Sequence, residues 1–225
     1  MILIKPSFKI LEIMGNCGGM TPLKWIEVAG RTCYKSEDKI TKDSSEKFVK
    51  MITDRGHESV IEHSAMTVKF ICDRGVSHEL VRHRLCAFSQ ESTRYVNYKG
   101  GCTFVIPPWC SEIIDVGDHE APINFSFPTI EEKAALSWLA FMLKCEKQYK
   151  KLLDTGWSPQ QARSVLPNST KTEIVVTANL REWKHILTLR TSKAAHPQMR
   201  EIMLPLLADV KAWIPIIFDK IGEEK

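Results

Sequence analysis

The stretch at residues 197–221 constrains the fold more than any other part of the sequence. Its spacing predicts one long helix that is unusually apolar. A helix with so little polar surface has to be buried, either in the core or against another subunit. Pro205 and Pro215 should kink it, because proline removes a backbone donor. The apolar residues are Ile202, Met203, Leu204, Leu206, Leu207, Val210 and Trp213.

The rest of the chain mixes helical and extended patterns and contains no internal repeat. Helices are predicted from Pro22 behind an N-cap at Thr21, and over residues 45–55, 76–88, 129–153, 158–167 and 180–190. Strands are predicted over 8–14, 65–72 and 172–178, with one short strand in 98–109 and loops over 15–19 and 36–44. With 225 residues, of which 44% are hydrophobic, the chain can bury one large core. We therefore expect a single domain over residues 1–225.

The formal net charge of +4 is only a mild basic excess. Proteins that mainly coat nucleic acid carry denser tracts of Lys and Arg, because phosphate contacts supply most of their affinity. The charge therefore favours a small anionic ligand, and we expect no nucleic-acid partner.

The seven cysteines are an odd number and include no C-x-x-C pair. This usage predicts reduced thiols and no zinc site. The N-terminus lacks the apolar region and cleavage site of a signal peptide, and no apolar run reaches the roughly 20 residues that span a bilayer. We expect a soluble, cytoplasmic protein without a membrane partner.

The stretch "RHRLCAFSQESTRY", residues 82–95, has the highest density of candidate functional side chains. If residues 76–88 form a helix, Arg82 and Arg84 project about 200° apart and cannot both hold one phosphate. Either two ligands meet at this helix, or one arginine binds a ligand while the other pairs with a carboxylate. Glu79, three residues before Arg82, is such a partner.

Further polar residues extend this candidate site. Residues 89–94, "SQESTR", offer hydroxyls, an amide and the Arg94 guanidinium, which suits bidentate contact with phosphate. Arg163, Arg181 and Arg190 lie near the ends of predicted elements. Neither a G-x-G-x-x-G nor a G-x-x-x-x-G-K-[ST] motif occurs, so side chains would have to hold any nucleotide.

These residues resemble the signature of the flavin-dependent thymidylate synthases: R-H-R, seven residues, then Ser92 followed by Thr93, Arg94 and Tyr95. The likeness continues in "GHESVIEH" at 56–63, "ARSVLP" at 162–167 and "TANLREWKHILTLR" at 177–190, with His196 and Gln198 beyond. Four blocks in the right order cover most of the chain.

The resemblance implies an α+β fold in which helices pack on a small sheet, assembled as a homotetramer with active sites at subunit junctions. It implies conversion of dUMP to dTMP, in which methylene-tetrahydrofolate donates the carbon. FAD, reduced by NADPH, would supply the hydride. No metal is expected.

The resemblance also implies roles for individual residues. The expected FAD contacts are Ser59, Arg82, His83, Arg84, Gln90, Asn179, Arg181 and His185. The expected dUMP contacts are Glu79, Arg82, Gln90, Glu91, Ser92, Thr93, Arg94, Arg163 and Arg190, with Glu79 at a position where many relatives have Gln. His57 is expected near the flavin ring or as a capping or core histidine, and the role of His196 stays open.

Arg190 is the expected catalytic residue. By resemblance its guanidinium would lie beside N3 and the neighbouring carbonyl oxygen of uracil, where it favours the enolate-like form that is methylated at C5. Without the resemblance, an arginine at a helix C-terminus is explained by the helix dipole. Cys86 has no evident base nearby and is expected to be filler. Ser92 belongs to no readable catalytic triad and is expected to bind phosphate.

Two other classes of function stay open. A nucleic-acid-binding module would use the basic excess and stack bases on Tyr95, Tyr98 and Trp109. A structural subunit would use the apolar C-terminal helix only for assembly. A purified protein that shows flavin absorbance would count against both.

Overall fold

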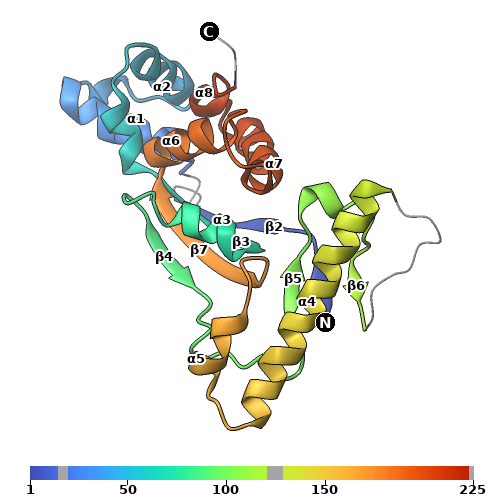
Figure 1. Ribbon diagram of the computed structural model, residues 1–225. Helices are drawn as coiled ribbons and strands as arrows, with labels where there is room; N and C mark the ends of the chain where they lie inside the picture. Colours follow the sequence, from blue (N-terminus) through green and yellow to red (C-terminus); the bar gives the residue numbers. More distant parts are fainter. Residues whose placement is uncertain (15–19, 121–128, 223–225) are drawn as a thin grey trace. The chain divides into compact units, whose positions relative to one another are not determined.

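A computed structural model describes residues 1–14, 20–120 and 129–222 of the chain. These residues divide into two compact units, each assembled from separate stretches of sequence (Figure 1). Unit 1 comprises Met1–Ser7, Phe70–Leu80 and Ser89–Ile174, and unit 2 comprises Phe8–Lys69, Val81–Phe88 and Val175–Lys225. The loop expected over 15–19 lies outside the described residues. One domain over residues 1–225 stays a prediction.

Unit 2 contains a group of helices packed against one another: α1 contacts α2, α2 contacts α8, and α6 contacts α7. As expected, Thr21 begins α1, because its Oγ1 accepts a hydrogen bond from the Lys24 backbone at 3.3 Å. Trp183 of α6 is fully buried, and its indole donates to the Met66 carbonyl at 2.8 Å. The helices are α1 (Pro22–Tyr34), α2 (Ser44–Asp54), α6 (Leu180–Arg190), α7 (Pro197–Trp213) and α8 (Pro215–Phe218).

Unit 1 contains the longest helix, α4 (Ile130–Asp154), and a three-stranded sheet in the order β5-β1-β6. A capping box starts α4: the Thr129 backbone donates to Glu132 at 2.6 Å, and the Glu132 backbone donates to the Thr129 hydroxyl at 3.2 Å. The buried core of unit 1 includes Leu3, Phe104, Ile106, Leu139, Met142 and Tyr149. The other elements are β1 (Ile2–Ile4), β5 (Thr103–Val105), β6 (Gly117–Asp118), α3 (Arg74–Leu80) and α5 (Pro159–Ala162).

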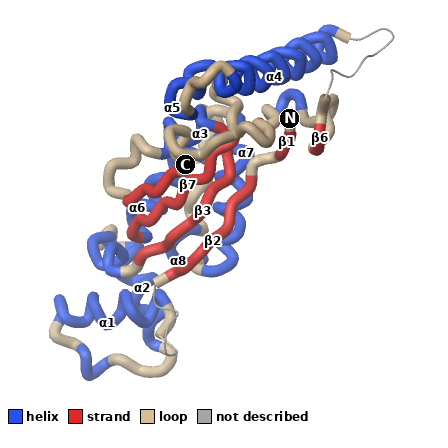
Figure 2. Tube along the Cα trace, turned by 90° about the horizontal axis from the view of Figure 1, so that it is seen from below, coloured by secondary structure: helices blue, strands red, loops and turns tan. Residues whose placement is uncertain are grey.

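A second sheet has four strands in the order β2-β3-β7-β4, and Figure 2 shows β2, β3 and β7 side by side. Buried residues alternate along β3 and β7, as expected where one face of a sheet is covered. Helix α3 directly follows β3 and α6 directly follows β7. The strands are β2 (Ser7–Ile13), β3 (Ala65–Asp73), β7 (Lys171–Asn179) and β4 (Ala87–Gln90). The mixture of helices and small sheets agrees with the expected α+β class.

The helix expected over 76–88 is the main error of the sequence-based prediction. Helix α3 ends at Leu80, residues 81–86 form turns, and Ala87–Gln90 form β4 next to β7. Residues 87–90 pair with a distant strand, and this pairing overrides the local helical spacing. A sequence pattern does not reveal such a pairing. The expectation that Arg82 and Arg84 project about 200° apart on one helix is therefore wrong.

The apolar C-terminal stretch is also not one helix. Helix α7 continues past Pro205 and ends at Trp213, and Pro215 then takes the first position of the short helix α8. Proline is tolerated there because the first helical N–H has no intrahelical partner. Within the described part of the chain, no helix is both long and apolar enough to cross a membrane.

Candidate functional site

The turn after α3 buries one side chain of the R-H-R triplet and exposes the other two. His83 is 6% exposed, whereas Arg82 and Arg84 are exposed. The Nε of Arg190, the last residue of α6, donates to Nε2 of His83 at 3.0 Å. Two segments that are 107 residues apart thus meet in unit 2.

Three groups of α6 surround the His83 ring. Besides Arg190, the buried Glu182 places Oε1 3.7 Å from Nδ1, and the His185 ring lies edge-on with its centroid 6.0 Å away. Burial first, then the positive charge of Arg190 and then His185, lower the pKa of His83 from 6.5 to about 4. The ring is therefore neutral at physiological pH.

Cys86 lies in the same turn. Burial, with a smaller contribution from the Glu182 carboxylate, raises the pKa of its thiol to about 12. Such a thiol is protonated near neutral pH and is a poor nucleophile.

A cavity of about 750 Å³ in unit 2 opens beside α6. It brings together three of the residues expected to contact FAD, namely Asn179, Arg181 and His185, whereas Ser59 and Arg84 are not among its lining residues. Its other lining residues are Glu58, Glu62, Leu85, Glu182, Lys184 and Thr188.

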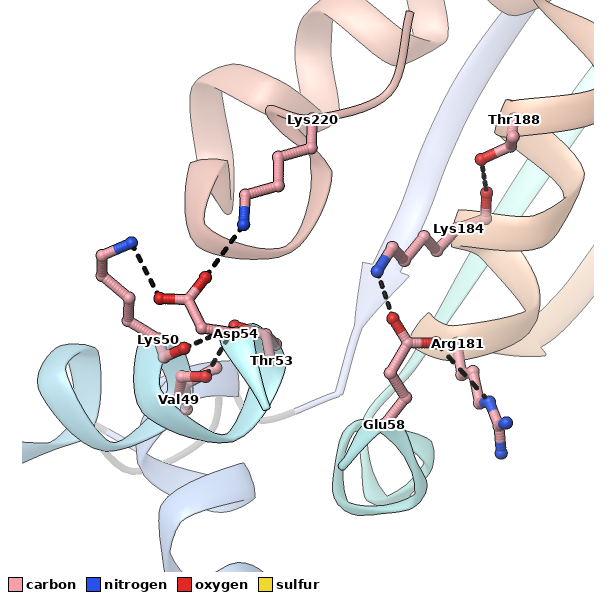
Figure 3. A network of polar contacts seen from close by, with 9 residues as sticks. All are labelled: Val49, Lys50, Thr53, Asp54, Glu58, Arg181, Lys184, Thr188 and Lys220. Carbon is pink, nitrogen blue, oxygen red and sulfur yellow. Dashed lines mark hydrogen bonds and ion pairs between the residues drawn. The ribbon is translucent and has the colours of Figure 1, made fainter. Parts of the chain in front are cut away.

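The cations of this cavity are paired with carboxylates. Figure 3 shows Glu58 in contact with both Lys184 and Arg181, where the Arg181 Nε is 3.8 Å from Oε2. The Nη1 of Arg181 also donates to Glu62 at 2.5 Å. Asn179 serves the fold, since its Oδ1 caps α6 by accepting from the Glu182 backbone at 2.8 Å.

A second cavity, of about 460 Å³, lies in unit 1 and is lined by Arg74, Thr93, Gln160, Arg163, Ser164 and Leu166. The Nη1 of Arg163 donates to the Thr93 hydroxyl at 3.3 Å. The Nη1 of Arg74 is buried and has no hydrogen-bond partner. No carboxylate is among the lining residues, so the cavity concentrates positive charge.

The loop before this cavity holds the remaining residues expected to bind dUMP. Glu91 accepts from the Tyr98 hydroxyl at 2.7 Å and pairs with Lys171 at 3.0 Å. Ser92 accepts from the Arg94 backbone at 3.3 Å, and the Arg94 guanidinium lies 5.5 Å from the centroid of the Tyr95 ring. Burial raises the pKa of Tyr98, and its bond to Glu91 adds to this shift.

Three expected site residues are used within the fold. The Gln90 amide donates to Ser77 at 2.9 Å and to Thr172 at 3.1 Å. The His57 Nδ1 lies 2.8 Å from the Tyr34 hydroxyl. The Nδ1 of His196 accepts from the Gln198 backbone at 3.3 Å and thereby caps α7. Glu79, at the end of α3, is half-buried.

Sequence reasoning missed several side chains of these cavities: Arg74, Glu58, Glu62, Glu182 and Lys184. A signal existed for Arg74, which is the first residue after β3 and opens α3. The others lie within the resembling blocks 56–63 and 177–190, but the resemblance gave them no role. A third cavity, of about 760 Å³, lies between α1, α2 and the end of α7 and contains none of the expected site residues. Among residues 1–14, 20–120 and 129–222, no cluster of His, Cys, Asp or Glu is arranged to hold a metal.

The chain is similar to a known protein family over most of its length. The family model described as "Thymidylate synthase complementing protein" matches residues 19–216. The flavin-dependent thymidylate synthase of Geobacter sulfurreducens is 33% identical over 205 residues, which cover 88% of this chain and 81% of that protein. That of Mycobacterium tuberculosis is 32% identical over 200 residues, with coverages of 86% and 77%.

A solved structure shares the fold. The crystal structure of the UMP/dUMP methylase PolB from Streptomyces cacaoi, bound with 5-Br dUMP, superposes with a TM-score of 0.75 and covers 97% of this chain and 96% of that one. The sequences are 22% identical, so this likeness bears on the fold alone.

Proposed function

Because the chain belongs to the family of flavin-dependent thymidylate synthases and is a methyltransferase enzyme, we propose that it converts dUMP to dTMP. The carbon would come from methylene-tetrahydrofolate and the hydride from FAD that NADPH has reduced. The observation that carries the proposal is the bond between Arg190 and His83, which joins the signature triplet to the residue expected to activate uracil.

The nucleotide phosphate would bind in the cavity of unit 1. Two guanidiniums, a threonine hydroxyl and no carboxylate line it, which suits a doubly charged phosphate monoester. Arg163 and Thr93 would hold the phosphate together with Arg74, while Ser92, Arg94 and Glu91 follow in the adjoining loop. Glu79, Gln90 and Arg82 complete the proposed dUMP contacts.

Arg190 would act on the base. A guanidinium at N3 and the adjacent carbonyl oxygen stabilises the negative charge of the enolate-like form, in which C5 is nucleophilic. The Nε of Arg190 is bonded to His83, so the guanidinium already has a fixed orientation before substrate arrives.

The cavity of unit 2 fits a flavin nucleotide. An amide, an imidazole, a guanidinium and an ammonium group line about 750 Å³ together with three carboxylates, so a pyrophosphate would replace Glu58 and Glu62 as the partner of the cations. Asn179, Arg181 and His185 would hold the cofactor, with Ser59, Arg82, His83, Arg84 and Gln90 as further proposed contacts. When bound and reduced, the flavin supplies the two electrons that turn the transferred methylene into a methyl group. His57 is proposed to lie near its ring.

A homotetramer in the cytoplasm is part of the same proposal. Leu85 and Tyr95, both within the stretch 82–95, are 75% and 79% exposed. Apolar and aromatic side chains left so open beside a proposed site are typical of surfaces that another subunit covers.

The test is anaerobic mixing of the purified protein, loaded with FAD, with NADPH, dUMP and methylene-tetrahydrofolate, followed by assay for dTMP. We expect dTMP only when all components are present. A flavin-loaded protein that forms no dTMP would overturn the proposal. A colourless protein that rejects FAD and binds RNA or DNA with steep salt dependence would instead favour the nucleic-acid module.

A further inference from the structure

We propose that His83 and Glu182 are positioning residues that orient the Arg190 guanidinium through a single tautomer of the His83 ring. The inference rests on the proposed function and deepens it. The resemblance assigns His83 only a cofactor contact and assigns Glu182 nothing.

The geometry fixes which ring nitrogen carries the proton. The Nε of Arg190 can only donate, so Nε2 of His83, 3.0 Å away, has to accept and must be unprotonated. In a neutral imidazole the proton is then on Nδ1. This tautomer turns an N–H toward the carboxylate of Glu182.

Glu182 is held in place to favour that tautomer. Its backbone N–H is capped by Asn179 in the first turn of α6, and its side chain is buried. The Oε1 to Nδ1 distance of 3.7 Å is too long for a hydrogen bond, so the carboxylate acts through its charge. A buried negative charge beside Nδ1 stabilises an N–H there.

The surroundings also keep the ring neutral. Burial and the charge of Arg190 both oppose a second proton, and His185 adds to their effect. Protonation at Nε2 would replace an acceptor with a donor facing a guanidinium, and the hydrogen bond would be lost. The groups that face the ring, Glu182, His185 and Arg190, all belong to α6, and Cys86 lies in the turn of His83 itself.

The hydrogen bond to His83 is made by Nε of Arg190, so it restricts rotation of the guanidinium plane. An arginine side chain otherwise has many rotamers, and part of that freedom would be lost each time the transition state forms. Fixing the plane in advance therefore raises kcat more than it improves substrate affinity.

The experiment compares two substitutions of His83 in the FAD-loaded enzyme. His83→Gln keeps an acceptor near the position of Nε2, whereas His83→Leu removes it. We expect His83→Leu, assayed with saturating FAD, to lower kcat on the order of 100-fold with little change in KM for dUMP. His83→Gln should recover most of the loss. The matched control is His119→Leu, a histidine that lines neither proposed cavity, which should change nothing.

Two further measurements separate positioning from a merely structural role. In an Arg190→Lys background, which lacks Nε, His83→Leu should cause no additional loss. Glu182→Leu and Glu182→Gln should each lower kcat severalfold, because both remove the carboxylate charge beside Nδ1. A crystal structure of His83→Leu should show an unchanged fold and a displaced Arg190 side chain.

The outcomes also distinguish this inference from the proposed function. If the wild-type protein forms no dTMP, the proposed function fails. If the wild type is active and His83→Leu has the same kcat at saturating FAD, the positioning role is wrong. Equal activity of the Gln and Leu variants would also contradict it.

Discussion

The two proposed ligand cavities differ in whether carboxylates pair with their cationic side chains. In unit 2, Arg181 and Lys184 are paired with the carboxylates of Glu58 and Glu62. In unit 1, Arg74 leaves a buried nitrogen unpartnered, and no carboxylate lines the cavity. A buried guanidinium nitrogen that lacks a hydrogen-bond partner is costly unless a ligand supplies one. In the cavity of unit 1 the guanidiniums can therefore bind an anion directly. In the cavity of unit 2 an anionic ligand has to displace the carboxylates that pair with Arg181 and Lys184.

Arg190 differs from Arg181 in that its Nε is bonded to a neutral imidazole, whereas the Nε of Arg181 lies near a carboxylate. Replacing it should have the largest effect of any single change: Arg190→Ala should lower kcat by about 1000-fold, the upper range for loss of one electrostatic group. Steady-state dTMP formation measures this, with flavin absorbance as the control. Unchanged turnover with flavin still bound would refute the role of Arg190.

The neutral state of His83 predicts a pH dependence of stability. Above pH 6.5 the ring is neutral in both folded and unfolded chains. As the pH falls from 6.5 to about 4, the unfolded chain gains a proton that the folded chain resists, so the free energy of unfolding decreases by about 3 kcal/mol. Urea denaturation at several pH values should show this loss in the wild type and not in His83→Gln. Parallel pH profiles of the two proteins would contradict it.

Because one nitrogen of Arg74 lacks a hydrogen-bond partner, we expect that replacing Arg74 weakens dUMP binding but does not destabilise the fold. Arg74→Met should raise KM for dUMP by about 10- to 100-fold, because it removes a charge-assisted contact to phosphate. The same change should not lower, and is expected to raise, the melting temperature, since a buried nitrogen without a hydrogen-bond partner disappears.

Two controls sharpen this prediction. Arg55→Gln, at an exposed position outside both cavities, should leave KM unchanged. Binding of deoxyuridine, which lacks the phosphate, should be the same in wild type and Arg74→Met. A loss of deoxyuridine binding in the variant would show that Arg74 does not act on the phosphate.

The smallest expected effect concerns the ion pairs of unit 2. Glu62→Gln removes an exposed partner of Arg181, so the guanidinium no longer has to exchange a carboxylate for a ligand phosphate. We expect FAD to bind about two- to fivefold more tightly, in the range of exposed ion pairs. Fluorescence titration of flavin-free protein measures this. Weaker binding would mean that Glu62 itself helps to hold the cofactor.

Local patterns predicted most elements with small errors at their ends. The cap expected at Thr21 starts α1, because a cap depends only on neighbours along the chain, and the helix expected over 129–153 is α4. The β-branched stretch 172–178 became β7, and the apolar stripe of 180–190 became the buried face of α6. Strands β1 and β6 were missed because both are very short and owe their existence to pairing.

The candidate site was predictable in its residue types and not in its contacts. The resemblance identified Arg163, Arg181 and Arg190, and no pattern identified Arg74 or Glu182. Whether a charge is paired, buried or open depends on which distant segments pack beside it. Sequence spacing carries no such information beyond a turn or two of helix.

The sequence by itself determined the family, the cationic residues and the elements that carry them, because capping, periodicity and motif spacing are local properties of the chain. The tertiary structure alone decided that residues 81–86 leave the helix, that His83 is buried and neutral, and that Arg190 meets it across 107 residues. Desolvation and charge pairing act between groups that are close in space, so they emerge only once the chain has folded.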